Sequence, residues 1–102
     1  MRLKDNTVNV EDLIPEIRDR LPELDQVYEE FQTELVITSG KDGVHGKNSL
    51  HYEGKAIDLR TWNVLDNLVK RIRVQLGAEY DVILEKDHIH IEWDPKHEHV
   101  VG

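Results

Sequence analysis

The chain has 102 residues, with 13 Lys or Arg against 21 Asp or Glu, which gives a formal net charge of −8, and it has no Cys. The length fits one domain over residues 1–102 built from two packed layers, and the acidic balance argues against a nucleic-acid partner, because phosphate binding needs clustered basic side chains. The lack of Cys excludes disulfides, iron–sulfur clusters and thiolate zinc sites, and no apolar run approaches the roughly 20 residues that span a membrane, so we expect no membrane contact.

The N-terminal part of the chain predicts one or two helices followed by a strand. Residues 1–9 are polar and predict a loose arm or a short edge strand; they lack the apolar region of a secretion signal, so we expect a chain that is cytoplasmic when made. Apolar side chains then recur at steps of three and four, as on one face of a helix: Leu13, Ile17, Leu21, Leu24, Tyr28 and Phe31. Pro22 interrupts this series and predicts either a kink or two consecutive helices, with Pro22 in the first turn of the second. The mostly apolar, β-branched run at 35–38 predicts a buried strand, and residues 40–50 predict a long loop.

The rest of the chain predicts three strands and a helix. Residues 55–60 alternate and predict a strand. Asn63 can cap a following helix that Gly77 ends, and the apolar face of this helix is Leu65, Leu68, Val69, Ile72 and Leu76. Residues 80–85 and 89–93 predict two more strands, which form either an antiparallel hairpin or one strand bent at a bulge. Residues 95–102 predict a tail that is ordered only in part. The predicted fold class is α+β, with a small, mostly antiparallel sheet and two or three helices packed on one face.

Two segments carry side chains suited to metal binding. In the first, His51 ends the glycine-rich loop, and Asp58 lies on the next strand, on the same face as Ala56. In the second, an extended backbone directs His88 and His90 to one face. Two imidazole nitrogens and a carboxylate oxygen are ligands that zinc accepts, and a fourth position left to water distinguishes a catalytic site from a structural one. The spacing alone leaves open that His51 and Asp58 form a hydrogen-bonded core pair, and that His88 rather than His90 is the third ligand.

Residues 49–58 match every fixed position of S-x-H-x-x-G-x-A-x-D, the signature of the zinc D-alanyl-D-alanine peptidases. The same stretch is very similar to one in the amino-terminal signalling domain of animal hedgehog proteins, and Glu85 followed by His-Ile-His at 88–90 is similar to that domain's second metal segment. Leu-Val-Ile-Thr-Ser-Gly at 35–40 resembles the strand that opens the site in bacterial peptidases. Over about 13–93 the chain thus resembles the superfamily of lysostaphin, the D-Ala-D-Ala peptidases and sonic hedgehog, and the resemblance implies their fold.

This resemblance also implies a metal centre with one zinc ion. The ion would be held by His51, Asp58 and His90. Glu85 would act as the acid or base on the zinc-bound water, whose pKa zinc lowers to about 7, and His88 and His45 would line the site. Two other interpretations stay open: Glu85 as a solvated residue at a strand end, and His45 as a loop histidine in water.

The activity that the resemblance implies is that of a zinc metallopeptidase, which hydrolyses a peptide bond in bacterial cell-wall (peptidoglycan) peptides. Many bacterial members follow Ser-Gly with Tyr-Arg, and that arginine binds a substrate carboxylate. Here Lys41 and Asp42 follow, which favours a murein endopeptidase or an unusual substrate over a D-Ala-D-Ala carboxypeptidase. Without a secretion signal, such an enzyme fits a phage or prophage protein that reaches the wall by lysis or within a virion. The alternative is a hedgehog-like zinc-binding interaction module with little or no peptidase activity; we expect a monomer.

Overall fold

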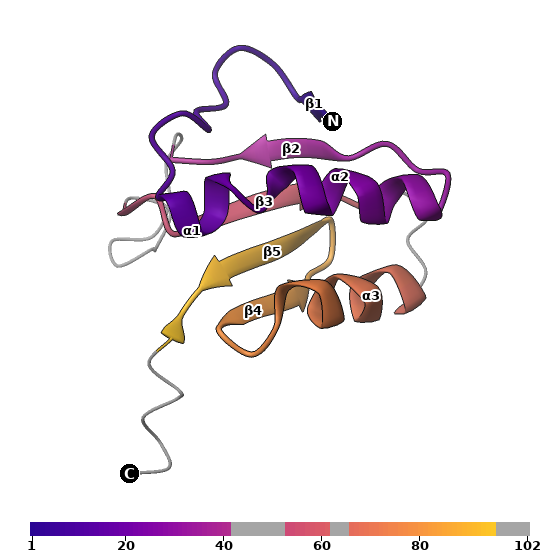
Figure 1. The fold of residues 1–102 in the computed structure, drawn as a ribbon. Helices are drawn as coiled ribbons and strands as arrows, with labels where there is room; N and C mark the ends of the chain where they lie inside the picture. The colour runs from indigo at the N-terminus through magenta and orange to yellow at the C-terminus, as the bar shows by residue number, and fades with distance from the viewer. Residues whose placement is uncertain (42–52, 62–65, 96–102) are drawn as a thin grey trace, which may run out of the picture.

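One sheet with helices on a single face makes up the part of the chain that the computed structural model describes, residues 1–41, 53–61 and 66–95 (Figure 1). In chain order its elements are β1 (Arg2–Leu3), α1 (Pro15–Arg18), α2 (Leu21–Glu30), β2 (Val36–Ser39), β3 (Ala56–Arg60), α3 (Asp66–Leu76), β4 (Tyr80–Leu84) and β5 (His88–Trp93). The predicted α+β class is confirmed, and the predicted strands from β2 onward agree with the observed ones to within one residue at either end.

The two N-terminal helices are separate, which decides between the two outcomes that the proline pattern allowed. Pro15 and Pro22 lie in the first turns of α1 and α2, where a missing N–H costs no helical hydrogen bond and the fixed φ suits a helix start. Both helices contribute apolar side chains to the core, namely Ile17, Leu21, Leu24, Val27 and Tyr28.

The strand order in the described sheet is β1-β2-β3-β5-β4. β1 pairs with β2 in parallel, and the remaining pairings are antiparallel, so the sheet is mixed and mostly antiparallel. β1 is the short edge strand predicted within 1–9. β4 and β5 form the predicted hairpin, which a hydrogen bond of 2.8 Å from the Glu85 N–H to the His88 carbonyl closes. Because β5 passes between β4 and β3, residues 56–60 pair with 88–92, a contact across some thirty residues of chain.

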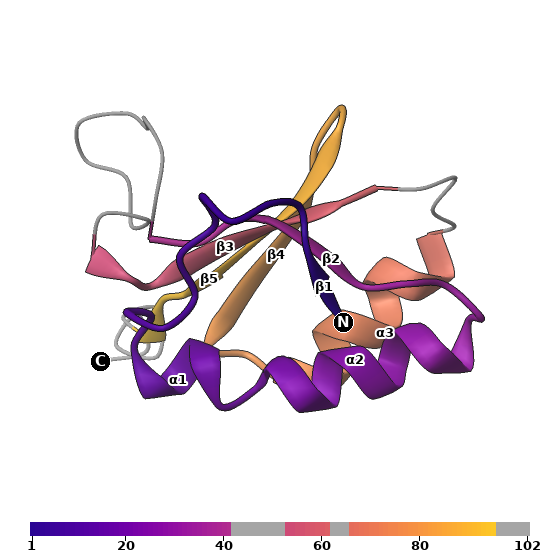
Figure 2. The same cartoon turned by 90° about the horizontal axis from the view of Figure 1, so that it is seen from above.

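The apolar side of the sheet packs against the described helices, which lie together on one face in Figure 2. The strand side chains on this face are almost completely buried: Ile37, Ile57, Leu59, Ile89 and Ile91. α3 buries the part of its predicted apolar face that the structure describes: Leu68, Val69, Ile72 and Leu76. Since side chains alternate along a strand, the polar residues between the buried ones, Asp58 and His90 among them, are turned toward the opposite face.

Several predictions concern residues outside the described ranges: the cap at Asn63, the apolar Leu65, most of the loop 40–50 and the tail beyond residue 95. The single domain over 1–102 stays a prediction. The helix predicted between Asn63 and Gly77 ends where expected, because α3 stops before Gly77, whose φ is 91°. None of the described helices has both the length and the apolar character needed to cross a membrane.

Candidate metal centre

Asp58 and His90 lie directly opposite each other on neighbouring strands. They are register partners in the antiparallel pairing of β3 with β5, and Asp58 Oδ1 is 2.9 Å from His90 Nδ1. Both side chains are largely buried, with exposed fractions of 15% and 16%. The buried neighbours Ile57 and Leu59 hold β3 against the core, and this fixes the direction in which Asp58 points.

His88 approaches the same carboxylate from two residues earlier on β5. Its Nε2 is 3.8 Å from Asp58 Oδ1 and 3.7 Å from Glu85 Oε2, and its Nδ1 is 2.7 Å from Asp87 Oδ1. Asp58 therefore lies between two imidazole rings, as the shared face of His88 and His90 predicts. Glu85 lies at the outer side of the group, with 45% of its side chain exposed.

A cavity of about 410 Å³ opens beside this group. It is lined by Lys4, Thr38, Ser39, Asp58, Arg60, Asp87 and His88. The structure thus brings together Asp58, His88, His90 and Glu85 from the predicted site. His45 and His51 lie outside the described residues, so their roles stay predictions, and the same holds for the identity of the third ligand.

The electrostatics of His90 favour a positive charge at this position. The pKa of His90 is raised from its ordinary value of 6.5, chiefly by the hydrogen bond to Asp58; burial opposes this, and a second hydrogen bond, to Glu92, adds to it. The pKa of Asp87 is lowered by its hydrogen bond with His88. An imidazole ring between two carboxylates holds its second proton more tightly than an imidazole ring in water does. A metal ion bound to the ring can supply the same positive charge between the carboxylates.

Sequence reasoning missed Glu92. Its Oε1 is 2.9 Å from His90 Nε2, so the ring of His90 has a carboxylate at each nitrogen. Glu92 also belongs with Asp81 and Asp94 to a carboxylate group whose oxygens lie within 4.8 Å of one another; this group could hold a metal ion and shows no preference for zinc. The signal was present in the sequence, because Glu92 continues the period-two alternation of the two histidines along β5.

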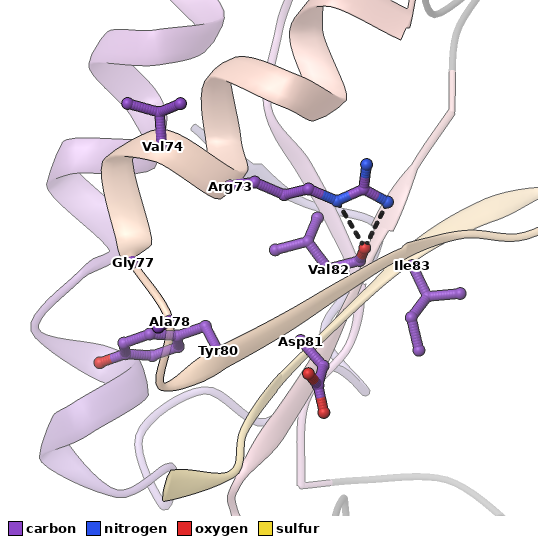
Figure 3. Close-up of a pocket in the computed structure, with 8 residues that line it drawn as sticks. All are labelled: Arg73, Val74, Gly77, Ala78, Tyr80, Asp81, Val82 and Ile83. Atoms are coloured by element: carbon purple, nitrogen blue, oxygen red, sulfur yellow. Dashed lines mark hydrogen bonds between the residues drawn. The ribbon is translucent and has the colours of Figure 1, made fainter. Parts of the chain in front are cut away.

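A larger hollow, of about 560 Å³, lies between α3 and the outer edge of β4 (Figure 3). Its lining is Arg73, Val74, Gly77, Ala78, Tyr80, Asp81, Val82 and Ile83. Arg73 donates two hydrogen bonds, of 3.1 and 2.8 Å, to the Val82 carbonyl at this edge. Among the predicted site residues that the structure describes, none lines this hollow, so its volume alone does not make it the site of the predicted chemistry.

The described residues thus form a small α+β fold. The face of its sheet that lies away from the helices carries a carboxylate between two histidines. No protein-family model matches the chain. Over 68 residues it is 34% identical to the Indian hedgehog B protein of Danio rerio and 35% identical to the Indian hedgehog proteins of Gallus gallus and Xenopus laevis. These stretches cover 62% of the chain but only 16–17% of the relatives, so the chain spans about a sixth of their length. The predicted similarity to hedgehog proteins is confirmed, and the relation to the bacterial peptidases stays a prediction.

Proposed function

We propose that the chain is a hedgehog-like zinc-binding domain in which His51, Asp58 and His90 hold one zinc ion. The observation that carries this proposal is the pairing of Asp58 with His90, which brings a carboxylate oxygen within 2.9 Å of an imidazole nitrogen. Two ligands of one tetrahedral zinc ion lie about 3.3 Å apart, so this pair has only to open slightly to share an ion. Nitrogen and oxygen are both ligands that zinc accepts.

His90 is a better candidate than His88 for the ligand on β5. The ring of His90 is 2.9 Å from Asp58, against 3.8 Å for His88, and a smaller part of its side chain is exposed, 16% against 29%. His88 is then left to line the site, where it can donate a hydrogen bond to a bound group. His51 is proposed on the 49–58 pattern, which supplies the histidine that the resemblance assigns to the metal.

The principal role that we propose is that of an interaction module. The relatives that match are hedgehog proteins, the same proteins whose signalling domain residues 49–58 and 85–90 resemble. In this role zinc ties β3 and β5 to the segment that bears His51 and so stabilises the surface around them. A polypeptide partner would then recognise that ordered surface, with little or no hydrolysis.

Peptide hydrolysis is the second candidate, and the position of Glu85 favours it. Its carboxylate is 3.7 Å from Nε2 of His88, its side chain is 45% exposed, and His88 itself lines the cavity. When bound, zinc supplies a water with a pKa near 7. Glu85 would then be the group that takes a proton from that water and passes it on to a leaving amine. The substrate class would be peptidoglycan peptides, for a protein delivered by lysis or in a virion.

The first experiment measures the zinc content of the full chain after purification. We expect about one zinc ion per chain for the wild type and almost none for His51→Ala and Asp58→Ala. Glu29→Ala, which removes an exposed carboxylate on α2, is the matched control and should keep the ion. Zinc retained by both site variants would contradict the metal centre.

The second experiment separates the two candidate functions. Purified peptidoglycan of several chemotypes is incubated with wild type, Glu85→Ala and Glu29→Ala, and newly released amino groups are counted. No release by a zinc-loaded wild type supports the interaction module. Release that falls by about 100-fold or more in Glu85→Ala alone supports the peptidase, because general-base catalysis contributes about 10²–10⁴-fold.

A further inference from the structure

We infer that Glu92 is a positioning residue of the metal centre, which accepts the Nε2 proton of His90 and so leaves Nδ1 as the metal-binding atom. This inference rests on the proposed zinc site, which it deepens by assigning the ligating atom of one residue and the group that selects that atom. Neither the 49–58 pattern nor the His-Ile-His segment contains Glu92.

The contacts around the His90 ring are symmetric. Each ring nitrogen has one carboxylate oxygen at 2.9 Å, Asp58 Oδ1 at Nδ1 and Glu92 Oε1 at Nε2. A neutral imidazole carries one proton, so one of its nitrogens faces a carboxylate as a donor and the other faces one with its lone pair. A lone pair and a carboxylate at this distance repel each other unless a second proton or a metal ion lies between them.

Asp58, the proposed carboxylate ligand, marks the side of the His90 ring that takes the zinc ion. On the Nδ1 side, Asp58 also lies within 3.8 Å of the His88 ring and lines the cavity of about 410 Å³. On the Nε2 side, Glu92 lies in the acidic group with Asp81 and Asp94, which could itself hold an ion. The zinc ligand that the 49–58 pattern supplies, Asp58, lies on the Nδ1 side. The proton therefore belongs at Nε2 and the metal at Nδ1.

Glu92 is held in place by its strand. It lies within β5, where its register partners are Ala56 on β3 and Asp81 on β4, so both edges of its backbone are paired. Its side chain is 20% exposed. A carboxylate on such a paired strand can fix both the tautomer and the orientation of a metal-binding ring, and the loss of such a partner typically weakens metal affinity by 10–100-fold.

The test combines zinc affinity with the protonation pattern of His90. Zinc affinity is measured by chelator competition on the full chain. We expect Glu92→Ala to bind zinc about 10–100-fold more weakly, and Glu92→Gln to recover most of this loss, because an amide oxygen still accepts the Nε2 proton. Asp81→Asn removes a neighbouring charge without touching His90 and should change the affinity less than about threefold.

Long-range ¹H–¹⁵N spectra of the histidine rings supply the second measurement. In the zinc-loaded chain we expect the proton of His90 at Nε2 and the metal at Nδ1, and in the metal-free chain at alkaline pH the Nε2–H tautomer. A metal at Nε2, or an unchanged affinity in Glu92→Ala, overturns the inference while the zinc site itself stands. An equal loss in Asp81→Asn and Glu92→Ala also overturns it, because the acidic group would then hold the ion.

Failure of the proposed function gives a different pattern. A wild type that binds no zinc, or that binds it unchanged after His51→Ala and Asp58→Ala, removes the zinc site. The metal-free spectrum then still decides the tautomer: the Nε2–H form supports the pairing of His90 with Glu92, and the Nδ1–H form overturns it.

Discussion

The carbonyl oxygen of Gly54 accepts a hydrogen bond of 3.0 Å from the N–H of Ile14, which ties the approach to β3 to the residue before α1. Gly54 has a φ of 74°, a conformation that glycine adopts at little cost and other residues rarely adopt. A Cβ at this position would lie 2.8 Å from the Asp12 carbonyl oxygen. The fixed glycine of the 49–58 pattern is therefore explained by close backbone packing between the segment that leads into β3 and the segment that leads into α1.

Replacing this glycine should destabilise the fold. We expect Gly54→Ala to lower the free energy of unfolding by about 3 kcal/mol, because it combines a left-handed backbone with a contact that the Asp12 carbonyl cannot easily relieve. Gly77→Ala is the matched control: its φ is 91°, but nothing lies within 4 Å of the added Cβ, so the loss should be about 1 kcal/mol. Urea unfolding followed by circular dichroism measures both. Equal losses would contradict the role given to the Asp12 contact.

The proposed metal centre predicts a specific effect of removing one charge. Asp58→Asn keeps the shape of the side chain but removes the anionic ligand, so zinc affinity should fall by at least about 100-fold. This loss is larger than the loss expected for a residue such as Glu92, which contacts a ligand and not the ion. Asp19→Asn removes an exposed carboxylate at the end of α1 and should leave the affinity unchanged. Competition with a fluorescent chelator measures both variants. Zinc binding that survives Asp58→Asn would place the ion elsewhere.

Removal of the metal should lower the melting temperature. A ligand present at about 100 times its dissociation constant adds about 2.7 kcal/mol to the stability of the folded state. For a chain of this size, that corresponds to a decrease of roughly 10–20 °C when EDTA is added. Differential scanning calorimetry with EDTA, and then with zinc restored, measures the shift. The melting temperature of His51→Ala should not respond to EDTA; a response equal to that of the wild type would argue against His51 as a ligand.

The stability of the metal-free chain should depend on pH through His90. Its pKa is raised above 6.5 in the folded state, first by the hydrogen bond to Asp58 and then by Glu92, against the effect of burial. The folded chain therefore binds this proton more tightly than the unfolded chain does, so the stabilisation is fully present below pH 6.5 and is lost as the pH rises through the folded-state pKa.

The comparison with His90→Gln isolates this effect. Urea unfolding in EDTA, from about pH 5 to about pH 9, should show the wild type losing stability relative to the variant as the pH rises. The same proton competes with zinc, so the zinc affinity of the wild type should weaken as the pH falls. Parallel pH profiles of the two proteins would show that His90 keeps its ordinary pKa in the folded chain.

Much of the fold could be predicted because its determinants are local. Pro22 separates two helices since a proline is favoured in a first turn, and Gly77 ends α3 because it takes up a positive φ. The short link between β4 and β5 predicts a hairpin for the same kind of reason: it leaves little room for another connection. The sequence also predicted the shared face of His88 and His90, which follows from the period of a strand.

The sequence by itself predicted most of the helices and strands, because these follow from propensity and periodicity within a few residues. It also supplied the proposed ligand set, because short segments of the chain resemble a known metal-binding pattern. Only the tertiary structure decided that β5 passes between β3 and β4, that Asp58 stands opposite His90, and that Glu92 takes the other side of the ring. Pairings between strands some thirty residues apart depend on how the whole core packs, and no local pattern records that choice.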